Sequence, residues 1–317
     1  MATSEVHDHD RGLQFDLATL SRRRALLLLA GSALGVLAGC SPDGSTSAGS
    51  TPAGSTTSTS GAGSTTSTVG ASATAAGTAD CAPIPEETAG PFPGDGSNGP
   101  NVLSQNGIVR RDIRSSFGSS STVAPGVPLT IDVVVVDSIG SCRAIPGAAV
   151  YVWHCDRAGG YSLYSSGVTG ENYLRGVQTT DASGRVSFTS IFPAAYPGRW
   201  PHIHFEIYKT LGAATSGGGR VATSQIAIPK AACDEVYATA GYQASVSPMA
   251  RTTLANDNVF RDDGGESQLG TISGNVRDGY RLELRVPVNP NAVSSGNNAP
   301  GTDGAPAGAP PGAAPRR

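Results

Sequence analysis

The chain has 317 residues and a formal net charge of −3 at pH 7, from 22 basic and 25 acidic side chains. Its 42 glycines and 22 prolines, with long Ser/Thr/Gly/Ala runs, leave room for one folded domain of about 200 residues rather than two. The one tight arginine cluster, Arg22-Arg23-Arg24, belongs to a targeting segment, so the charge pattern excludes a nucleic-acid partner.

Residues 1–40 have the pattern of an export signal. The arginine cluster precedes an uncharged, mostly apolar stretch from Ala25 to Ala38, which is shorter than the roughly 20 residues a membrane span needs. The stretch ends Leu37-Ala38-Gly39-Cys40, which resembles the lipobox of bacterial lipoproteins, whose cysteine is lipidated. We therefore expect an exported protein, extracellular or on the outer face of the cytoplasmic membrane, with a lipid on Cys40 as its only membrane contact. The twin-arginine and general secretion routes both stay open.

Two further segments lack the composition of a folded domain. Residues 41–80 are almost entirely Ser, Thr, Gly and Ala, and such a segment cannot bury enough apolar surface to offset its ordering entropy. Residues 289–317 are mostly Pro, Gly, Ala and Asn. We expect a flexible linker over 41–80, a folded domain over 81–288 and a disordered tail over 289–317.

Short strand patterns dominate the predicted domain. Turn clusters such as Asp181-Ala182-Ser183-Gly184 separate the runs, and helical pattern is confined to about one or two turns near Cys233–Thr239 and Met249–Ala255. Many short strands with Gly- and Pro-rich connections predict an all-β fold, an antiparallel β-sandwich with long irregular loops. The predicted strands are Leu129–Val136, Ala149–His154, Arg185–Phe192, His202–Tyr208, Val221–Ile228 and Tyr280–Val286.

Four cysteines remain in the exported part when Cys40 is set aside: Cys81, Cys142, Cys155 and Cys233. An even number in an oxidising compartment predicts two disulfides, and three connectivities are open. Free buried thiols are the alternative. A thiolate metal site is not indicated, because no two of these cysteines have the close spacing of a zinc knuckle.

The stretch from Tyr196 to Phe205 is the chemically densest part of the chain. Two prolines and a glycine predict a turn that leads into a strand, on which His202 and His204 alternate with apolar residues. Residues two apart on a strand share a face and lie about 6.5 to 7 Å apart at Cα, so both imidazoles can bind one metal ion. The alternative is a pair of strand histidines without metal. The phenol of Tyr196 and the guanidinium of Arg199 favour the metal site.

A second stretch, Trp153-His154-Cys155-Asp156-Arg157-Ala158-Gly159-Gly160-Tyr161-Ser162, places a tyrosine beyond two glycines after a strand. Together with Asn172-Tyr173-Leu174-Arg175-Gly176 and residues 193–205, it resembles the intradiol ring-cleavage dioxygenases, the ferric enzymes that open catechol and protocatechuate. The resemblance runs from Thr88-Ala89-Gly90-Pro91-Phe92 to Val286 and is densest from Ala149 to Phe205.

The resemblance implies an iron(III) centre with four protein ligands. Tyr161 and Tyr196 correspond to the two phenolate ligands, and His202 and His204 to the two imidazole ligands. Iron(III) is a hard cation that prefers oxygen anions, and two phenolates with one hydroxide neutralise its three positive charges in a partly dry pocket.

The resemblance also implies catalytic roles. Tyr196 matches the ligand that departs when substrate binds and then acts as a base, Arg199 matches the arginine that steadies the activated substrate, and Gln225 matches a glutamine beside the pocket. The implied reaction inserts both atoms of O2 into a small aromatic diol and gives a cis,cis-muconate-type product. The choice among catechol, protocatechuate and hydroxyquinol stays open. So does the oligomeric state, because the seven residues between Asp80 and Thr88 leave no room for the helical dimerisation domain of the catechol-specific branch.

Two other functions compete with this one. Glu206 continues the alternation after His204 and suggests a two-His-one-carboxylate iron(II) or zinc enzyme, although His202 and Glu206 would lie about 13 Å apart at Cα. The other is a lipid-anchored β-sandwich that binds a polysaccharide or protein without catalysis, with structural histidines. Metal content and colour separate the three.

Overall fold

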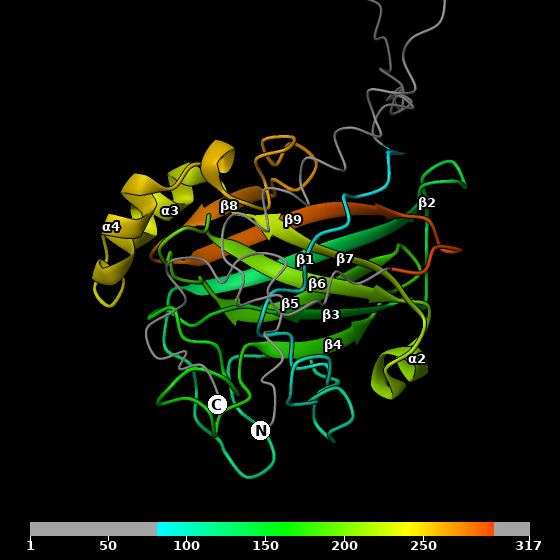
Figure 1. The fold of residues 1–317 in the computed structure, drawn as a ribbon, viewed down its shortest axis with the longest axis horizontal. Helices are drawn as coiled ribbons and strands as arrows, with labels where there is room; N and C mark the ends of the chain where they lie inside the picture. Colours follow the sequence, from blue (N-terminus) through cyan, green and yellow to red (C-terminus); the bar gives the residue numbers. More distant parts are fainter. Residues whose placement is uncertain (1–80, 295–317) are drawn as a thin grey trace, which may run out of the picture. The chain divides into compact units, whose positions relative to one another are not determined.

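Residues 81–294, described by a computed structural model, form a sandwich of two β-sheets with few helices (Figure 1). This confirms the all-β fold class expected from the strand patterns. The predicted export signal with Cys40, the predicted linker and the predicted tail beyond residue 294 lie outside the described residues.

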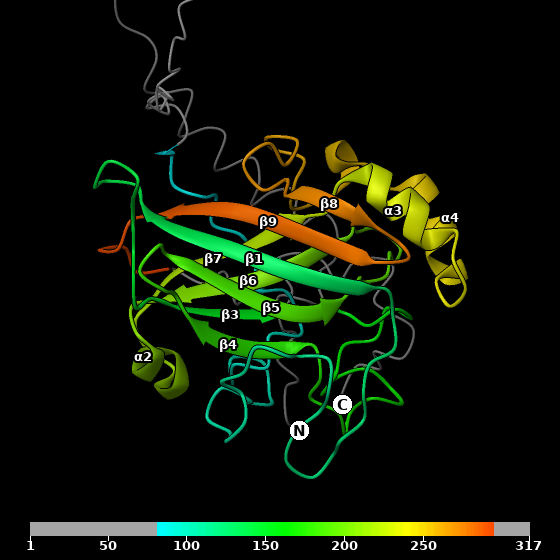
Figure 2. The same cartoon turned by 180° about the vertical axis from the view of Figure 1, so that it is seen from behind.

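The first sheet is organised around β1 (Pro128–Asp137), whose alternate side chains from Leu129 to Val135 are fully buried between the sheets. This sheet faces the viewer in Figure 2. β1 pairs antiparallel with β5 and, at its end, with β2, but parallel with β9, which departs from the purely antiparallel sandwich expected. The other strands of the sheet are β2 (Arg143–Ala144), β5 (Arg185–Ile191), β8 (Thr271–Asn275) and β9 (Gly279–Val288).

The second sheet has the order β4-β3-β6-β7 and is antiparallel throughout. All seven residues of β6 are buried, because Ile203 and Phe205 pack in the core between the sheets while His202 and His204 occupy the opposite face under a second apolar cluster. The predicted two-residue alternation is therefore confirmed. The strands are β3 (Ala149–Trp153), β4 (Arg175–Thr179), β6 (His202–Tyr208) and β7 (Arg220–Ala227).

Helices are short and lie at the ends of the sandwich (Figure 1). The two regions with helical pattern contain α3 (Lys230–Tyr237), α4 (Gln243–Arg251) and the 3-10 helix η3 (Leu254–Asn256). The sequence did not indicate α2 (Leu211–Ser216), which Thr210 caps by accepting a hydrogen bond from the Ala213 N–H. No helix within the described range is long and apolar enough to cross a membrane.

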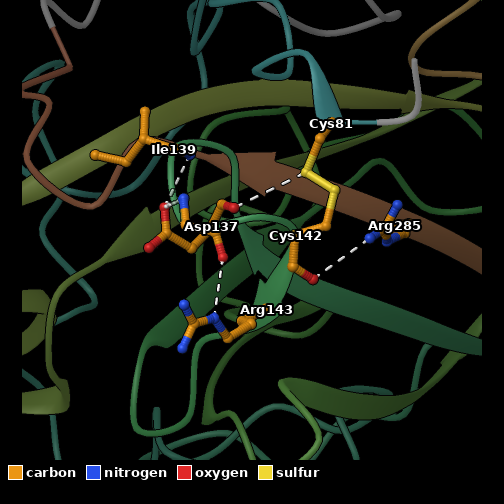
Figure 3. The surroundings of a disulfide bond; sticks show 7 residues. Cys81, Asp137, Ile139, Cys142, Arg143 and Arg285 are labelled. Atoms are coloured by element: carbon orange, nitrogen blue, oxygen red, sulfur yellow. Dashed lines mark hydrogen bonds between the residues drawn. A yellow bond between two sulfur atoms is a disulfide. The ribbon is translucent and has the colours of Figure 1, made fainter. Parts of the chain in front are cut away.

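Residues 81–94, which we call the strap, cross the outer face of the second sheet (Figure 1, cyan). The Ile84 N–H donates to the Pro287 carbonyl, and the Glu87 N–H donates to the Thr223 carbonyl. A disulfide between Cys81 and Cys142 fixes the beginning of the strap beside the end of β1 (Figure 3). The strap therefore runs from this crosslink to the face of β6 that carries the histidines.

The prediction of two disulfides is wrong. Cys155 and Cys233 are free thiols, both buried. They belong to different apolar clusters: Cys155 lies on the outer face of the second sheet and Cys233 in the core between the sheets. Burial raises the pKa of both thiols, so each remains protonated and behaves as a small apolar side chain.

Candidate metal centre

Four side chains singled out in the sequence converge on one point. The Tyr161 Oη lies 3.2 Å from the Tyr196 Oη and 3.4 Å from the His202 Nε2. The His202 Nε2 lies 3.2 Å from the Tyr196 Oη and 3.1 Å from the His204 Nε2. Two neighbouring ligand atoms that each lie about 2.0 to 2.2 Å from one metal ion are about 2.8 to 3.6 Å from each other, if the ligand–metal–ligand angle is between the octahedral and the tetrahedral value. All four measured separations fall within that window.

Three different elements supply these donors. His202 and His204 come from the central strand β6, where both faces are covered and the side chains cannot change face. Tyr196 precedes the turn at Pro197 and Gly198, and Gly198 has a φ of 82°, a conformation that a glycine adopts without strain. Tyr161 follows the Gly159-Gly160 turn, where Asp156 Oδ1 accepts hydrogen bonds from the N–H groups of Ala158 and Gly160. The site therefore depends on one strand and two short turns.

The imidazole of His202 is oriented for ligation. Its Nδ1 lies 2.5 Å from the Trp200 carbonyl, which can only accept a hydrogen bond, so the proton is on Nδ1 and the lone pair is on Nε2. His204 is held differently, because its ring stacks on Trp153 with centroids 4.9 Å apart and an interplanar angle of 6°. The His202 Nε2 faces both phenols, and the His204 Nε2 faces the His202 Nε2.

Burial determines the protonation of this cluster. The four side chains are between 1% and 7% exposed. Desolvation lowers the pKa of His202 and His204 well below the usual range, so both imidazoles are neutral. Desolvation also raises the pKa of Tyr161 and Tyr196, and the nearby Arg199 opposes this rise only in part. The phenols therefore need a further positive charge in the pocket to become phenolates.

Arg199 lies beside the cluster and is itself buried. Its Nη2 donates to the Gln225 Oε1 at 2.5 Å, and the Gln225 Nε2 donates to the Thr88 carbonyl at 3.0 Å. Gln225 also pairs with His204 across the β6–β7 ladder. The structure thus brings the three predicted catalytic side chains, Arg199, Tyr196 and Gln225, into one buried cluster.

Asp257 belongs to this site and was missed in the sequence. Its Oδ2 accepts hydrogen bonds from the Arg199 Nε at 3.0 Å and the Trp200 N–H at 2.6 Å. Its Oδ1 accepts from the N–H groups of Val259 and Phe260. With all these contacts Asp257 is fully buried and fixes the direction of Arg199.

The strap packs against two of the four donor side chains. A Cβ placed on Gly90 would lie 3.3 Å from His204 Cε1, and the φ of Gly90 is 67°, so a glycine allows the backbone to approach the imidazole. The Phe92 ring packs on Tyr161 with centroids 5.0 Å apart. These contacts help to shield His204 and Tyr161 from solvent.

Glu206 does not join the cluster. Its carboxylate accepts hydrogen bonds from the Tyr208 hydroxyl at 2.6 Å and from Arg220, which also pairs with Asp95. Across residues 81–294 no three His, Cys, Asp or Glu side chains gather as a metal site. A metal site on His202 and His204 therefore has to use the tyrosines, and the two-His-one-carboxylate alternative finds no support.

The donor set fits iron(III). Two phenol oxygens and two imidazole nitrogens meet in a pocket where phenolates form only next to added positive charge, and a hard trivalent cation is the group that oxygen anions suit best. The residues that would hold the ion are Tyr161, Tyr196, His202 and His204.

Comparison with known proteins agrees with this geometry. The family model described as "Dioxygenase" matches residues 99–216, which include all four donors and Arg199 but not Gln225. No curated protein matches the chain.

Three solved structures illustrate the likeness. An intradiol ring-cleavage dioxygenase from Tetranychus urticae is 26% identical with a TM-score of 0.55, covering 68% of this chain and 98% of that chain. The dioxygenase Tetur07g02040 is 25% identical with the same TM-score and coverage. The dioxygenase domain of a carbohydrate-binding fusion from Streptomyces sp. SirexAA-E is 22% identical with a TM-score of 0.41, covering 65% of this chain and 97% of that chain. The family model and the first of these structures, joined with the fold, show that the chain is similar to the intradiol ring-cleavage dioxygenases, in its sequence over residues 99–216 and in the fold of its β-sandwich.

Proposed function

We propose that this protein is a non-haem iron(III) dioxygenase that cleaves a catechol-type aromatic between its two hydroxyl-bearing carbons. The observation that carries the proposal is the convergence of two phenol oxygens and the His202 Nε2, each 3.2 to 3.4 Å from the other two, with the His204 Nε2 3.1 Å from that of His202. When bound, iron(III) would stabilise the phenolates and withdraw electron density from the ring of a bound catecholate, so that a ring carbon can react with O2.

The protein's own residues divide the remaining tasks. A catechol must lose two protons as it binds, and we assign the Tyr196 Oη as the acceptor of one of them. Tyr196 precedes a turn whose next two residues, Pro197 and Gly198, are exposed, so a movement of this phenol disturbs little packing. Tyr161 is held between the strap and its own loop and stays in place.

Arg199 supplies a fixed positive charge beside the reacting ring. The side chain cannot lose its proton in a protein, and Asp257 and Gln225 hold its Nε and Nη2 in one direction. Such a preorganised charge is effective in a pocket that excludes water, because no solvent has to reorganise when negative charge develops on the substrate.

The test is product identification. Full-length protein loaded with ferric iron is incubated with catechol, protocatechuate and hydroxyquinol under 18O2, and products are identified by mass. We expect a ring-opened dicarboxylate that carries two 18O atoms from at least one substrate. Ring opening beside the diol, or incorporation of one 18O atom only, would contradict the proposal by showing a different oxygenase reaction. No turnover of any of the three substrates would contradict it and favour the non-catalytic binding alternative.

A further inference from the structure

The buried guanidinium of Arg175 takes no part in the proposed reaction, yet it holds both segments that enclose Tyr161. We propose that Arg175 is a positioning residue that clamps the strap against the Tyr161 loop (residues 161–165) and so fixes the phenol that stays in place. The role of that phenol rests on the proposed function, whereas the clamp rests on contacts that are present whatever the site binds.

Arg175 uses all five of its N–H groups. Two bonds reach the strap: Nη1 donates to the Pro93 carbonyl at 2.8 Å and Nη2 to the Phe92 carbonyl at 2.9 Å. Two reach the Tyr161 loop: Nε donates to the Ser162 Oγ at 3.0 Å and Nη2 to the Ser162 carbonyl at 2.9 Å. The fifth joins Nη1 to the Tyr151 hydroxyl at 3.2 Å. One planar group therefore joins two segments more than 60 residues apart in sequence.

The partners of Arg175 are all neutral oxygens. Within the described part of the chain no acidic side chain forms an ion pair with it, although the side chain is only 1% exposed. Burying a charge without a counter-charge is costly unless every donor is bonded, so this arrangement persists only while both segments stay in contact. A lysine keeps the charge but has three donors on one atom and cannot span the same set.

The Tyr161 side chain belongs to one clamped segment, and its ring packs against the other. Phe92, whose carbonyl binds Arg175, packs on the Tyr161 ring with centroids 5.0 Å apart. Ser162, bonded through both its hydroxyl and its carbonyl, directly follows Tyr161. The loop also closes on itself, because the Tyr161 N–H donates to the Ser165 Oγ and the Ser165 N–H donates to the Tyr161 carbonyl.

Two strained leucines flank the clamp. Leu163, in the Tyr161 loop, has a φ of 72°, and Leu174, which precedes Arg175, has a φ of 57°. Bulky residues rarely adopt a positive φ, and the strain persists only where the surroundings impose it. Loss of the clamp would let the loop relax and move the phenol.

The same guanidinium also supports the histidine side of the site. The Tyr151 ring, whose hydroxyl Arg175 contacts, stacks on Trp153 with centroids 4.9 Å apart, and Trp153 stacks on His204. Arg175 thus reaches Tyr161 through one hydrogen-bonded route and His204 through a row of stacked rings.

Amide hydrogen exchange of the full-length protein tests the clamp without metal. Arg175→Met removes all five hydrogen bonds. Arg175→Lys keeps the positive charge but loses the planar set of five N–H donors. We expect both variants to raise exchange at Gly94, Tyr164 and Ser165 at least about tenfold, since the Gly94 N–H donates from the strap to the Tyr164 hydroxyl and the N–H groups of Tyr164 and Ser165 close the loop on the Tyr161 carbonyl. Arg185→Met is the control, because Arg185 pairs with Glu283 on the first sheet and contacts neither segment.

The visible spectrum of the iron-loaded variants provides the second measurement. We expect the tyrosinate-to-iron band to shift or weaken in both Arg175 variants and to stay unchanged in Arg185→Met. Unchanged exchange in the two segments, or exchange raised equally by Arg185→Met, would overturn the clamp even if stability falls. A parent protein without colour in ferric iron would instead refute the proposed function, and the exchange result would still decide whether the clamp exists.

Discussion

The carboxylate of Asp257 orients Arg199, and no local pattern in the sequence marks it. Asp257 stands between Asn256 and Asn258, in a polar stretch that reads as an ordinary turn. In the structure it is fully buried and bonds four groups, including the Arg199 Nε. Its role becomes visible only when residues 58 positions apart are brought together.

Asp257→Asn should therefore reduce turnover without removing iron. A hydrogen bond to a charged group contributes about 1.5 to 3 kcal/mol, so a misplaced Arg199 should lower kcat about 10- to 100-fold. Steady-state kinetics and the visible spectrum of the ferric protein check this, with the band unchanged. Asp112→Asn, which breaks an exposed pair with Arg114, is the control and should leave kcat unaltered. Loss of the band together with activity would show that Asp257 acts on the metal site instead.

The two tyrosines should differ when each is replaced by phenylalanine. Tyr196→Phe removes a base as well as a donor, and should still bind iron and a catechol while turning over about 10² to 10⁴ times more slowly. Tyr161→Phe should remove the phenolate that remains next to bound substrate. The visible spectrum with catechol under anaerobic conditions separates them: the tyrosinate-to-iron band should persist in Tyr196→Phe and vanish in Tyr161→Phe. The opposite pattern would mean that the two roles are exchanged.

The candidate site could be predicted only where a short motif carries it. His202 and His204 follow from a two-residue alternation, and the structure places them on one face of β6. Tyr161 lies 41 residues before His202 and was assigned through the resemblance rather than through any spacing. Arg175 lies in a motif of the resemblance that predicts no function for it, because its role arises from contacts with a strap more than 80 residues away.

At the scale of elements, strands with a strong pattern were predicted and strands set by packing were not. β1 and β6 were predicted to within a residue or two, because their apolar and β-branched residues are buried. β4 was missed, since it reads Arg-Gly-Val-Gln-Thr and contains Gly176, where a Cβ would lie 2.5 Å from Ile113 Cγ2. The parallel pairing of β1 with β9 joins segments about 150 residues apart, and no local pattern records it.

The disulfide between Cys81 and Cys142 should stabilise the domain by holding the strap. Closing a loop with a sequence separation of 61 residues typically contributes about 2 to 4 kcal/mol. Cys142→Ser should lower the free energy of unfolding by that amount in a denaturant titration. A reducing agent should lower the stability of the parent equally and leave Cys142→Ser unaltered. A parent that is insensitive to reduction would show that the crosslink is absent in solution.

At the scale of the whole molecule, we propose that the domain is exported and held at a membrane through a lipid on Cys40. The basis is the sequence of residues 22–40, which lies outside the described residues. The parent should fractionate with membranes and Cys40→Ala should be soluble. Mass spectrometry of the N-terminal peptide checks the lipid directly. A parent found soluble in the cytoplasm with residues 1–39 intact would contradict this proposal.

The central claim is that Tyr161, Tyr196, His202 and His204 hold iron(III), and the most direct measurement is the visible absorption and iron content of the purified full-length protein. We predict about one iron per chain and a red-brown colour from phenolate-to-iron charge transfer. His204→Ala should lose most of the bound iron and most of the colour. Loss of an outer-sphere partner of a ligand typically lowers metal affinity about 10- to 100-fold, and loss of a ligand itself should lower it further. A colourless parent after exposure to ferric iron, or full occupancy and unaltered colour in His204→Ala, would contradict the claim.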